Sequence, residues 1–248
     1  MRAVEERLSQ VELRVLRLQE SVFGDAETTR RWARSLPDTD LTWGTVVGGD
    51  AFVREVDRLG GFGPTKTVVE IGPGYGRLLE ATSRLGFPFA QWVGLDISRQ
   101  NVEFLAERFP DRRTRFLVGN VETYPFDSRI DTVVSSLVFK HLQPSFARAL
   151  SNLRPHLAED ATVIFDLIEA GGDSSVAYLE HDPKARPEAT FIRKYTRPEV
   201  VSILTETGFE LQEFGHVTHQ ALFTRLLVVA RPKKSLSAVS AQPPRTGR

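Results

Sequence analysis

The sequence of residues 68–77, VVEIGPGYGR, decides the fold of this chain. Its apolar start predicts a buried strand, and the residues after the third glycine predict a helix. Glycine at every second position from 72 to 76 leaves the turn between them with little side-chain bulk. A ligand can therefore lie against bare backbone, beside the positive end of the following helix. The segment predicts a binding site for a nucleotide-type cofactor.

Two classes of cofactor are compatible with a strand, a glycine turn and a helix. A dinucleotide site uses the pattern G-x-G-x-x-G to support a pyrophosphate. This turn has the pattern G-x-G-x-G, and Arg77 stands where the last dinucleotide glycine would be. Glu70, two residues before the first glycine, places an acid beside the cofactor, which suits a cationic or zwitterionic ligand better than a pyrophosphate. A nicotinamide-dependent oxidoreductase is the alternative.

The segment VVEIGPGYGR resembles motif I of the class I S-adenosylmethionine-dependent methyltransferases, and the resemblance extends from about residue 49 to residue 232. It implies an α/β, Rossmann-like, doubly wound sheet of seven mostly parallel strands with an antiparallel last strand. It also implies S-adenosyl-L-methionine as cofactor and a small molecule as methyl acceptor. In this first turn, the cofactor-binding residues that the resemblance implies are Glu70, Gly72, Pro73, Gly74 and Gly76.

Three later segments resemble further parts of the cofactor site. In residues 93–98, VGLDIS, the resemblance assigns the ribose hydroxyls to Asp96, although Asp96 or Ser98 could instead cap the next helix. In residues 116–122, FLVGNVE, it assigns adenine to the loop at Asn120, where a plain β-turn fits equally well. Residues 130–136 resemble the fourth strand. The remaining cofactor-binding residues expected in these segments are Ile97, Val121, Glu122 and Ser136.

The segment LVFKHL, residues 137–142, follows the fourth strand, and the resemblance places His141 near the methyl acceptor. Imidazole titrates near neutral pH and can remove the proton of an alcohol acceptor, whereas an amine needs only to be neutral. A surface or helix-capping histidine is the alternative. Asp166 and Glu169, at the end of the fifth predicted strand, could orient His141 or bind acceptor hydroxyls. The spacing of His216 and His219 on a predicted strand indicates structural residues.

The acceptor pocket is expected to combine aromatic rings with hydrogen-bonding groups, which suits a sugar or another polar small molecule. We therefore expect an O-methyltransferase that acts on a hydroxyl of a sugar or glycosylated metabolite, with N-methylation or a non-catalytic relative as alternatives. The sequence contains no dense set of oxygen ligands, so it does not predict a metal site. The candidate substrate-binding residues are Trp43, Tyr75, Phe139, Lys140, Tyr178, His181 and Tyr195.

The composition fits one cytoplasmic α/β domain with additions. The 248 residues carry no net charge, which gives no electrostatic case for a nucleic-acid partner. Cysteine is absent, so disulfides and thiolate chemistry are excluded. The N-terminus is charged from Arg2 onward, and no apolar segment is long enough to predict a membrane span or a signal sequence.

The chain divides into four predicted parts. Residues 1–24 carry a heptad pattern that predicts a homodimeric coiled coil or, alternatively, a helix folded back on its own domain. A helical cap is expected at 25–63, the cofactor-binding domain at 64–232 and a disordered tail at 233–248. Residues 169–195 have no clear period, and we expect a loop there over the carboxyl edge of the sheet.

Overall fold

The computed structural model describes residues 32–34, 47–127, 129–180 and 190–234 of the chain. The predicted N-terminal helix at 1–24 and nearly all of the predicted tail lie outside these residues. The helices are α3 (Asp50–Arg58), α4 (Arg77–Leu85), α5 (Arg99–Arg108), α6 (Ala147–Leu153) and α7 (Arg197–Glu206), with short 3-10 turns η1 (Phe139–His141) and η2 (Arg154–His156). The strands are β1 (Gly63–Ile71), β2 (Phe89–Asp96), β3 (Thr114–Val118), β4 (Ile130–Ser135), β5 (Leu157–Glu169), β6 (Val176–Glu180), β7 (Thr190–Tyr195), β8 (Phe209–His219) and β9 (Phe223–Pro232).

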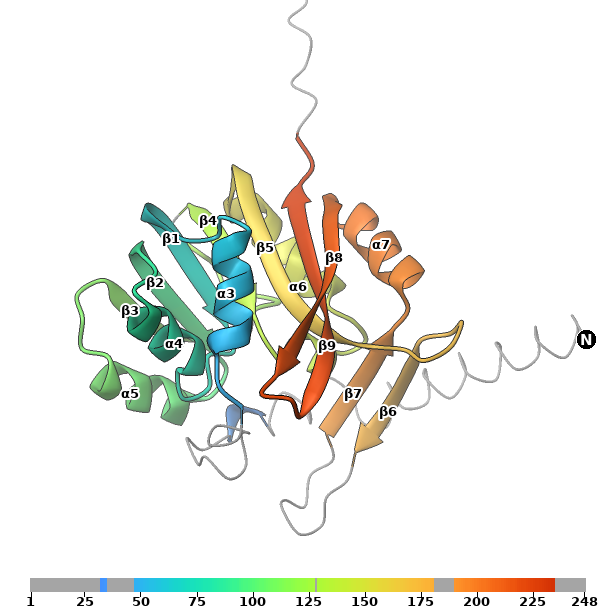
Figure 1. The fold of residues 1–248 in the computed structure, drawn as a ribbon, viewed down its shortest axis with the longest axis horizontal. Helices are drawn as coiled ribbons and strands as arrows, with labels where there is room; N and C mark the ends of the chain where they lie inside the picture. Colours follow the sequence, from blue (N-terminus) through green and yellow to red (C-terminus); the bar gives the residue numbers. More distant parts are fainter. Residues whose placement is uncertain (1–31, 35–46, 128, 181–189, 235–248) are drawn as a thin grey trace, which may run out of the picture.

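A mostly parallel sheet forms the centre of the molecule (Figure 1). Strands β3, β2, β1, β4 and β5 lie side by side in that order and run parallel. Strand β9 pairs antiparallel with β5, and β8 pairs antiparallel with β9. The expected parallel sheet with antiparallel closing strands is therefore confirmed. The order reverses between β1 and β4, and such a reversal opens a crevice at the carboxyl ends of the strands.

Within the described residues the sheet has nine strands rather than the expected seven, because the segment after β5 contributes two strands. It contains the antiparallel hairpin of β6 and β7. Strand β7 continues the sheet by pairing with the end of β5, where Ile168 lies opposite Lys194. Both strands are short and β6 is only partly buried, so the sequence lacks the clear alternation that predicts a strand.

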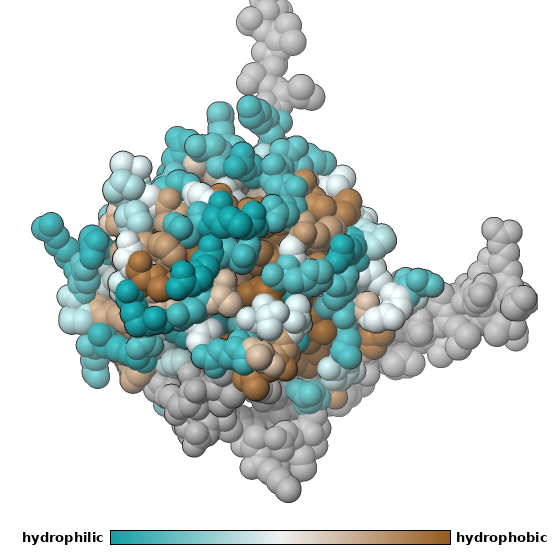
Figure 2. Space-filling model, in the orientation of Figure 1, coloured by the Kyte–Doolittle hydropathy of each residue, from teal (hydrophilic) through white to brown (hydrophobic). Residues whose placement is uncertain are grey.

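Two apolar layers cover the two faces of the sheet. One layer joins α3 and α4 to the sheet around Trp92, and the other joins α6 and α7 around Phe165. The ring of Phe165 is completely buried, with ring centroids 4.8 Å from Phe139 and 5.1 Å from Phe146. Figure 2 shows hydrophilic side chains over much of the face that carries α3, with apolar patches between them.

Among the described residues, no helix has both the length and the apolar character needed to cross a bilayer.

An acid, Glu70, is buried inside the layer beneath α3 and α4. Side chains alternate along a strand, so Glu70 of β1 faces the same side as Val68 rather than the crevice. Its carboxyl group accepts a hydrogen bond from Trp92 Nε1 at 3.1 Å and is 2% exposed. Burial raises the pKa of Glu70 to about 8, although the charge of Arg77 opposes the rise. The expected position of Glu70 beside the cofactor is therefore corrected.

We predict that Phe165→Ala lowers the free energy of unfolding by about 3–5 kcal/mol, because it leaves a cavity between packed aromatic rings. Urea denaturation measures this change. Leu222→Ala is the control, since Leu222 is 52% exposed and its truncation should cost less than about 0.5 kcal/mol. Equal losses in the two variants would contradict the assignment of Phe165 to the core.

We also predict that the stability difference between Glu70→Gln and the parent protein depends on pH. The folded state raises the pKa of Glu70 from 4.5 to about 8, so it binds the proton more tightly than the unfolded state. The contribution of Glu70 to stability is therefore lost as pH rises from 4.5 toward 8. Glutamine cannot ionise, so the variant should gain relative stability across this window in denaturation curves.

The exposed residue Glu103 of α5 supplies the control for this pH series. Glu103→Gln should give a difference from the parent that stays nearly constant with pH. A constant difference for Glu70→Gln as well would show that the proton on Glu70 is not coupled to folding.

Candidate active site

A cavity of about 300 Å³ lies at the carboxyl ends of β1, β2 and β4, where the strand order reverses. The glycine turn after β1 forms its floor, and the loops after β2, β3 and β4 form its walls. The hairpin of β6 and β7 contributes a further side. The residues that line the cavity include Trp32, Gly72, Pro73, Gly74, Tyr75, Arg77, Asp96, Ile97, Asn120, Val121, Glu122, Ser136, Lys140, His141, Glu180, Thr190 and Ile192.

The three glycines of the turn have different functions. All three have a left-handed backbone, with φ of 68° at Gly72, 59° at Gly74 and 91° at Gly76. A Cβ at Gly76 would lie 2.4 Å from the Phe109 ring, so this glycine permits packing of α5 on the turn and does not line the cavity. A Cβ at Gly74 would meet nothing within 4 Å. Gly74 is therefore the position where a ligand can approach bare backbone.

Asp96, at the tip of β2, holds this turn in place. Its carboxylate accepts hydrogen bonds from the backbone N–H of Gly74 at 3.0 Å and of Ser98 at 2.8 Å. Burial raises the pKa of Asp96, and these hydrogen bonds oppose the rise. Ser98 caps α5 by accepting from the N–H of Asn101. The capping and cofactor interpretations of this segment are thus compatible, because different side chains carry them.

The loop after β3 lines the cavity through Asn120, Val121 and Glu122. The side-chain oxygen of Asn120 accepts a hydrogen bond from the N–H of Glu122 at 3.0 Å, so it already stabilises a turn. Val121 is 5% exposed and gives the cavity an apolar wall. The β-turn interpretation of this dipeptide is therefore confirmed, and the turn places its residues at the cavity.

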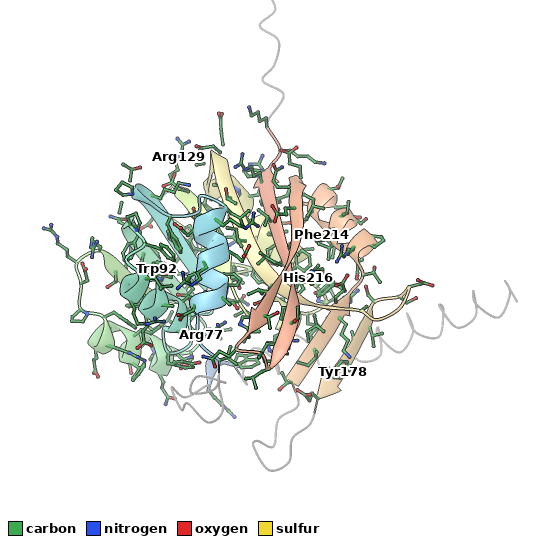
Figure 3. All side chains as sticks on the ribbon, viewed as in Figure 1. Arg77, Trp92, Arg129, Tyr178, Phe214 and His216 are labelled. Atoms are coloured by element: carbon green, nitrogen blue, oxygen red, sulfur yellow. The ribbon has the colours of Figure 1, made fainter. Side chains whose placement is uncertain are left out.

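Four residues expected at the acceptor site or in catalysis lie elsewhere. Phe139 and Tyr195 are fully buried in the layer around Phe146, because their strand and turn direct them into the core. Tyr178 lies on β6 (Figure 3) but does not line the cavity. The Lys194 ammonium lies 5.6 Å from the centre of its ring. Glu169 is on the surface, and its charge is paired with Arg197 at 2.7 Å. Trp43 and His181 lie outside the described residues.

Asp166 is fully enclosed just behind the cavity wall. Its carboxylate accepts from Ser136 Oγ at 2.5 Å and from the backbone N–H of Leu137 at 2.7 Å. His219 Nε2, from β8, lies 3.3 Å from the same carboxylate. Burial alone would raise the pKa of Asp166, but these contacts lower it below its ordinary value. Asp166 is therefore a structural anchor for the segment after β4, and His219 is the buried partner that the sequence did not reveal.

His141 lines the cavity and is oriented by a backbone carbonyl, not by Asp166. Its Nδ1 lies 2.8 Å from the carbonyl oxygen of Phe191, in β7. Since a carbonyl only accepts, Nδ1 carries the proton in this hydrogen bond and the lone pair of a neutral ring is on Nε2. The ring of Trp32 packs on the imidazole with centroids 4.6 Å apart. The two contacts fix the imidazole plane at the cavity wall.

Several cavity residues were not predicted as site residues. Arg77, the first residue of α4, donates from Nη2 to the Ser136 carbonyl at 3.1 Å, and its Nη1 is buried without a hydrogen-bond partner among the described residues. Its place directly after the glycine turn is a signal that could have identified it. Trp32 and the hairpin residues Glu180, Thr190 and Ile192 gave no such signal, because only the tertiary fold brings them to the cavity.

No group of three or more metal-ligating side chains occurs in the described parts of the chain.

Comparisons with known proteins identify the family. A family model for a methyltransferase domain matches residues 49–213. No curated protein sequence matches the chain. Among solved structures, a 1,6-didemethyltoxoflavin-N1-methyltransferase from Burkholderia thailandensis is similar, with a TM-score of 0.64 and 20% identity over 84% of this chain and 88% of that one.

Two further solved structures share the fold. The CcbJ methyltransferase from Streptomyces caelestis has a TM-score of 0.62 and 16% identity, covering 84% of this chain and 99% of that one. The glycopeptide N-methyltransferase MtfA has a TM-score of 0.59 and 18% identity, covering 75% of this chain and 90% of that one. The family match contradicts the oxidoreductase alternative. The chain belongs to the methyltransferase-domain family, and it is a class I S-adenosylmethionine-dependent methyltransferase.

Proposed function

We propose that this methyltransferase binds S-adenosylmethionine in the cavity and methylates a hydroxyl of a polar small molecule, such as a sugar or a glycosylated metabolite. The position of His141, held at the cavity wall by the Phe191 carbonyl, carries this proposal. When bound, the cofactor supplies an electrophilic methyl group on a sulfonium. The protein then has to align the acceptor with that group and to remove a proton.

The residues of the cavity fit an adenosine joined to an amino acid. The open backbone at Gly74 allows close approach of a ligand, and the carboxylate of Asp96 lies at the same wall. Val121 offers an apolar surface to a flat ring. The buried and unpartnered Nη1 of Arg77 is suited to a carboxylate. These four residues would hold the ribose, the adenine and the amino-acid end of the cofactor.

His141 is suited to accept a proton at Nε2. The Phe191 carbonyl accepts from Nδ1–H in the neutral ring, and it continues to accept when the ring becomes positively charged. The carbonyl dipole therefore favours the imidazolium that proton removal creates. This arrangement is most useful for an acceptor that must lose a proton while the new bond forms, which favours a hydroxyl.

N-methylation is the alternative, and the solved structures give a reason to keep it. One of the similar proteins is named as a glycopeptide N-methyltransferase and another as a 1,6-didemethyltoxoflavin-N1-methyltransferase. A neutral amine would have to be positioned in the cavity but would need no base, so His141 would not have to remove a proton.

We also propose that the enzyme is a cytoplasmic homodimer joined through residues 1–24. The heptad pattern of those residues supports the homodimer. The helix itself lies outside the described residues.

We predict that Gly74→Val abolishes binding of S-adenosylhomocysteine in calorimetry while the protein remains folded. The new side chain would enter the space of the ligand, and its left-handed backbone would cost about 1–2 kcal/mol. Gly86→Val is the matched control. Gly86 also has a positive φ, 74°, and open space around its Cβ position, but it ends α4 away from the cavity.

The Gly86→Val variant should therefore lose similar stability and keep its affinity. Normal affinity in Gly74→Val would show that the turn has only a structural function.

We predict that replacing His141 lowers turnover of a hydroxyl acceptor by about 10²–10⁴-fold, the usual contribution of a positioned general base. The acceptor is first identified by transfer of a labelled methyl group to a panel of sugars and glycosylated metabolites. His141→Asn keeps a donor near the position of Nδ1 and lacks Nε2, whereas His141→Gln offers a group near Nε2 that is not a base.

Both variants should bind S-adenosylhomocysteine like the parent enzyme. Turnover near the parent value in His141→Asn, with a proven hydroxyl acceptor, would contradict the function of His141 as base. Full activity on an amine acceptor would instead establish the N-methylation alternative.

A further inference from the structure

Lys140 is a cation in the wall of the cavity, and no ion pair joins it to another described residue. It is 8% exposed, and it lines the cavity beside His141. Among the described residues, no hydrogen-bond acceptor or carboxylate pairs with its Nζ. Its environment lowers the pKa of Lys140 to about 8, through burial first and then through the charge of Arg225. Its Nζ is not among the fully enclosed side-chain atoms of the described residues, so the ammonium is accessible and available to an anion that enters the cavity.

The two carboxylates that act on Lys140 are not available to pair with it, whereas Asp96 and Glu122 line the cavity at the loops after β2 and β3. Arg77 and Arg225 both act on Lys140 as like charges. Asp166 and Glu180 act on it as opposite charges, but neither lies within ion-pair distance. The carboxylate of Asp166 is already occupied by Ser136, Leu137 and His219. Glu180 is exposed at the end of β6, where water screens its charge.

Arg225, on β9, is the third cation in this region and adds positive charge near Lys140. It is partly buried, and burial lowers its pKa, although Asp166 and Tyr178 oppose this change. Its Nε has no hydrogen-bond partner among the described residues, and its guanidinium stacks on the Phe223 ring at 4.1 Å. Arg225 does not line the cavity, so it contributes charge rather than contact.

We propose that Lys140 binds an anionic group of the methyl acceptor, a carboxylate or a phosphate, next to His141. The proposal rests on the proposed methyl-transfer site and narrows its substrate class from polar to acidic small molecules. The anion would supply the missing counter-charge, and the ion pair would place the neighbouring hydroxyl at the imidazole. An acidic sugar fits this description.

The carboxylate of the cofactor itself is the other source of an anion in this cavity. Arg77 is better placed for that group, because it follows the glycine turn directly and carries the unpartnered Nη1. Lys140 instead follows β4 and shares its turn, η1, with His141. The two cations are therefore assigned to different anions, and this assignment can be tested.

The test compares Lys140→Met with the parent enzyme in calorimetry, using one set of cofactor-like probes and one set of acceptor-like probes. Methionine keeps the length and apolar packing of lysine and removes the charge. S-adenosylhomocysteine and 5′-methylthioadenosine differ in the amino-acid carboxylate. Inorganic phosphate and D-glucuronate are then titrated into the protein saturated with S-adenosylhomocysteine, with D-glucose as neutral match. Lys66→Met, on β1, is the control for loss of a lysine charge.

We expect phosphate or D-glucuronate to bind saturably to the parent, and D-glucose to bind more weakly. Lys140→Met should weaken anion binding about ten- to a hundredfold, as for a lost charged hydrogen bond, while affinity for S-adenosylhomocysteine stays unchanged. Unchanged cofactor affinity also shows that the variant is folded. In the parent, the bound anion should raise the pKa of the Lys140 ammonium, which NMR of the lysine side-chain nitrogens measures.

Three results would overturn the proposal. Absence of a saturable effect of either anion on the Lys140 resonance would show that no anion binds there. Equal anion affinity in Lys140→Met and the parent would place the anion elsewhere. A loss of affinity for S-adenosylhomocysteine but not for 5′-methylthioadenosine would assign Lys140 to the cofactor. Failure of the proposed function is distinct, because the parent would then not bind S-adenosylhomocysteine at all.

Discussion

The buried carboxylate of Asp166 is the interaction on which the active-site wall depends. It joins three strands, because it sits on β5, accepts from Ser136 and Leu137 at the end of β4, and contacts His219 of β8. Leu137 has a left-handed backbone with φ of 67°, which a non-glycine residue adopts only when its surroundings impose it. The chain can then turn into η1, and that turn presents Lys140 and His141 to the cavity.

A second carboxylate organises the opposite wall in a similar way. Asp96 ties the glycine turn to the start of α5 through the N–H groups of Gly74 and Ser98. Gly76 lets α5 approach the turn closely, because a Cβ there would collide with Phe109. Packing at Gly76 and the hydrogen bonds to Asp96 thus hold the turn in place. The backbone at Gly74 remains accessible to a ligand.

The two walls carry different electrostatic environments. The carboxylate of Asp96 accepts hydrogen bonds from backbone N–H groups, so no unpaired charge dominates that wall. The wall therefore suits the hydrogen-bonding groups of a nucleoside. Near Lys140 the cations outnumber the carboxylates that remain available. Charge in a partly buried cavity is weakly screened, so this asymmetry affects which molecules bind there.

The sequence by itself determined the sheet, the glycine turn and the identity of many cavity residues. Motif I and the alternation of strands and helices are local patterns, which residues close together in the sequence determine. The carboxyl ends of parallel strands meet at one edge, so the loops carrying Asp96, Asn120 and His141 could be placed together.

Only the tertiary structure decided which way each side chain faces and which distant residues complete the site. Glu70 faces the layer under α3, and Tyr195 faces the core, because strand alternation and packing outweigh proximity to the motif. The contacts of His141 with Trp32 and Phe191, and of Asp166 with His219, join residues that lie far apart in the chain. Such pairs leave no local pattern, since their partners are selected by the packing of whole strands.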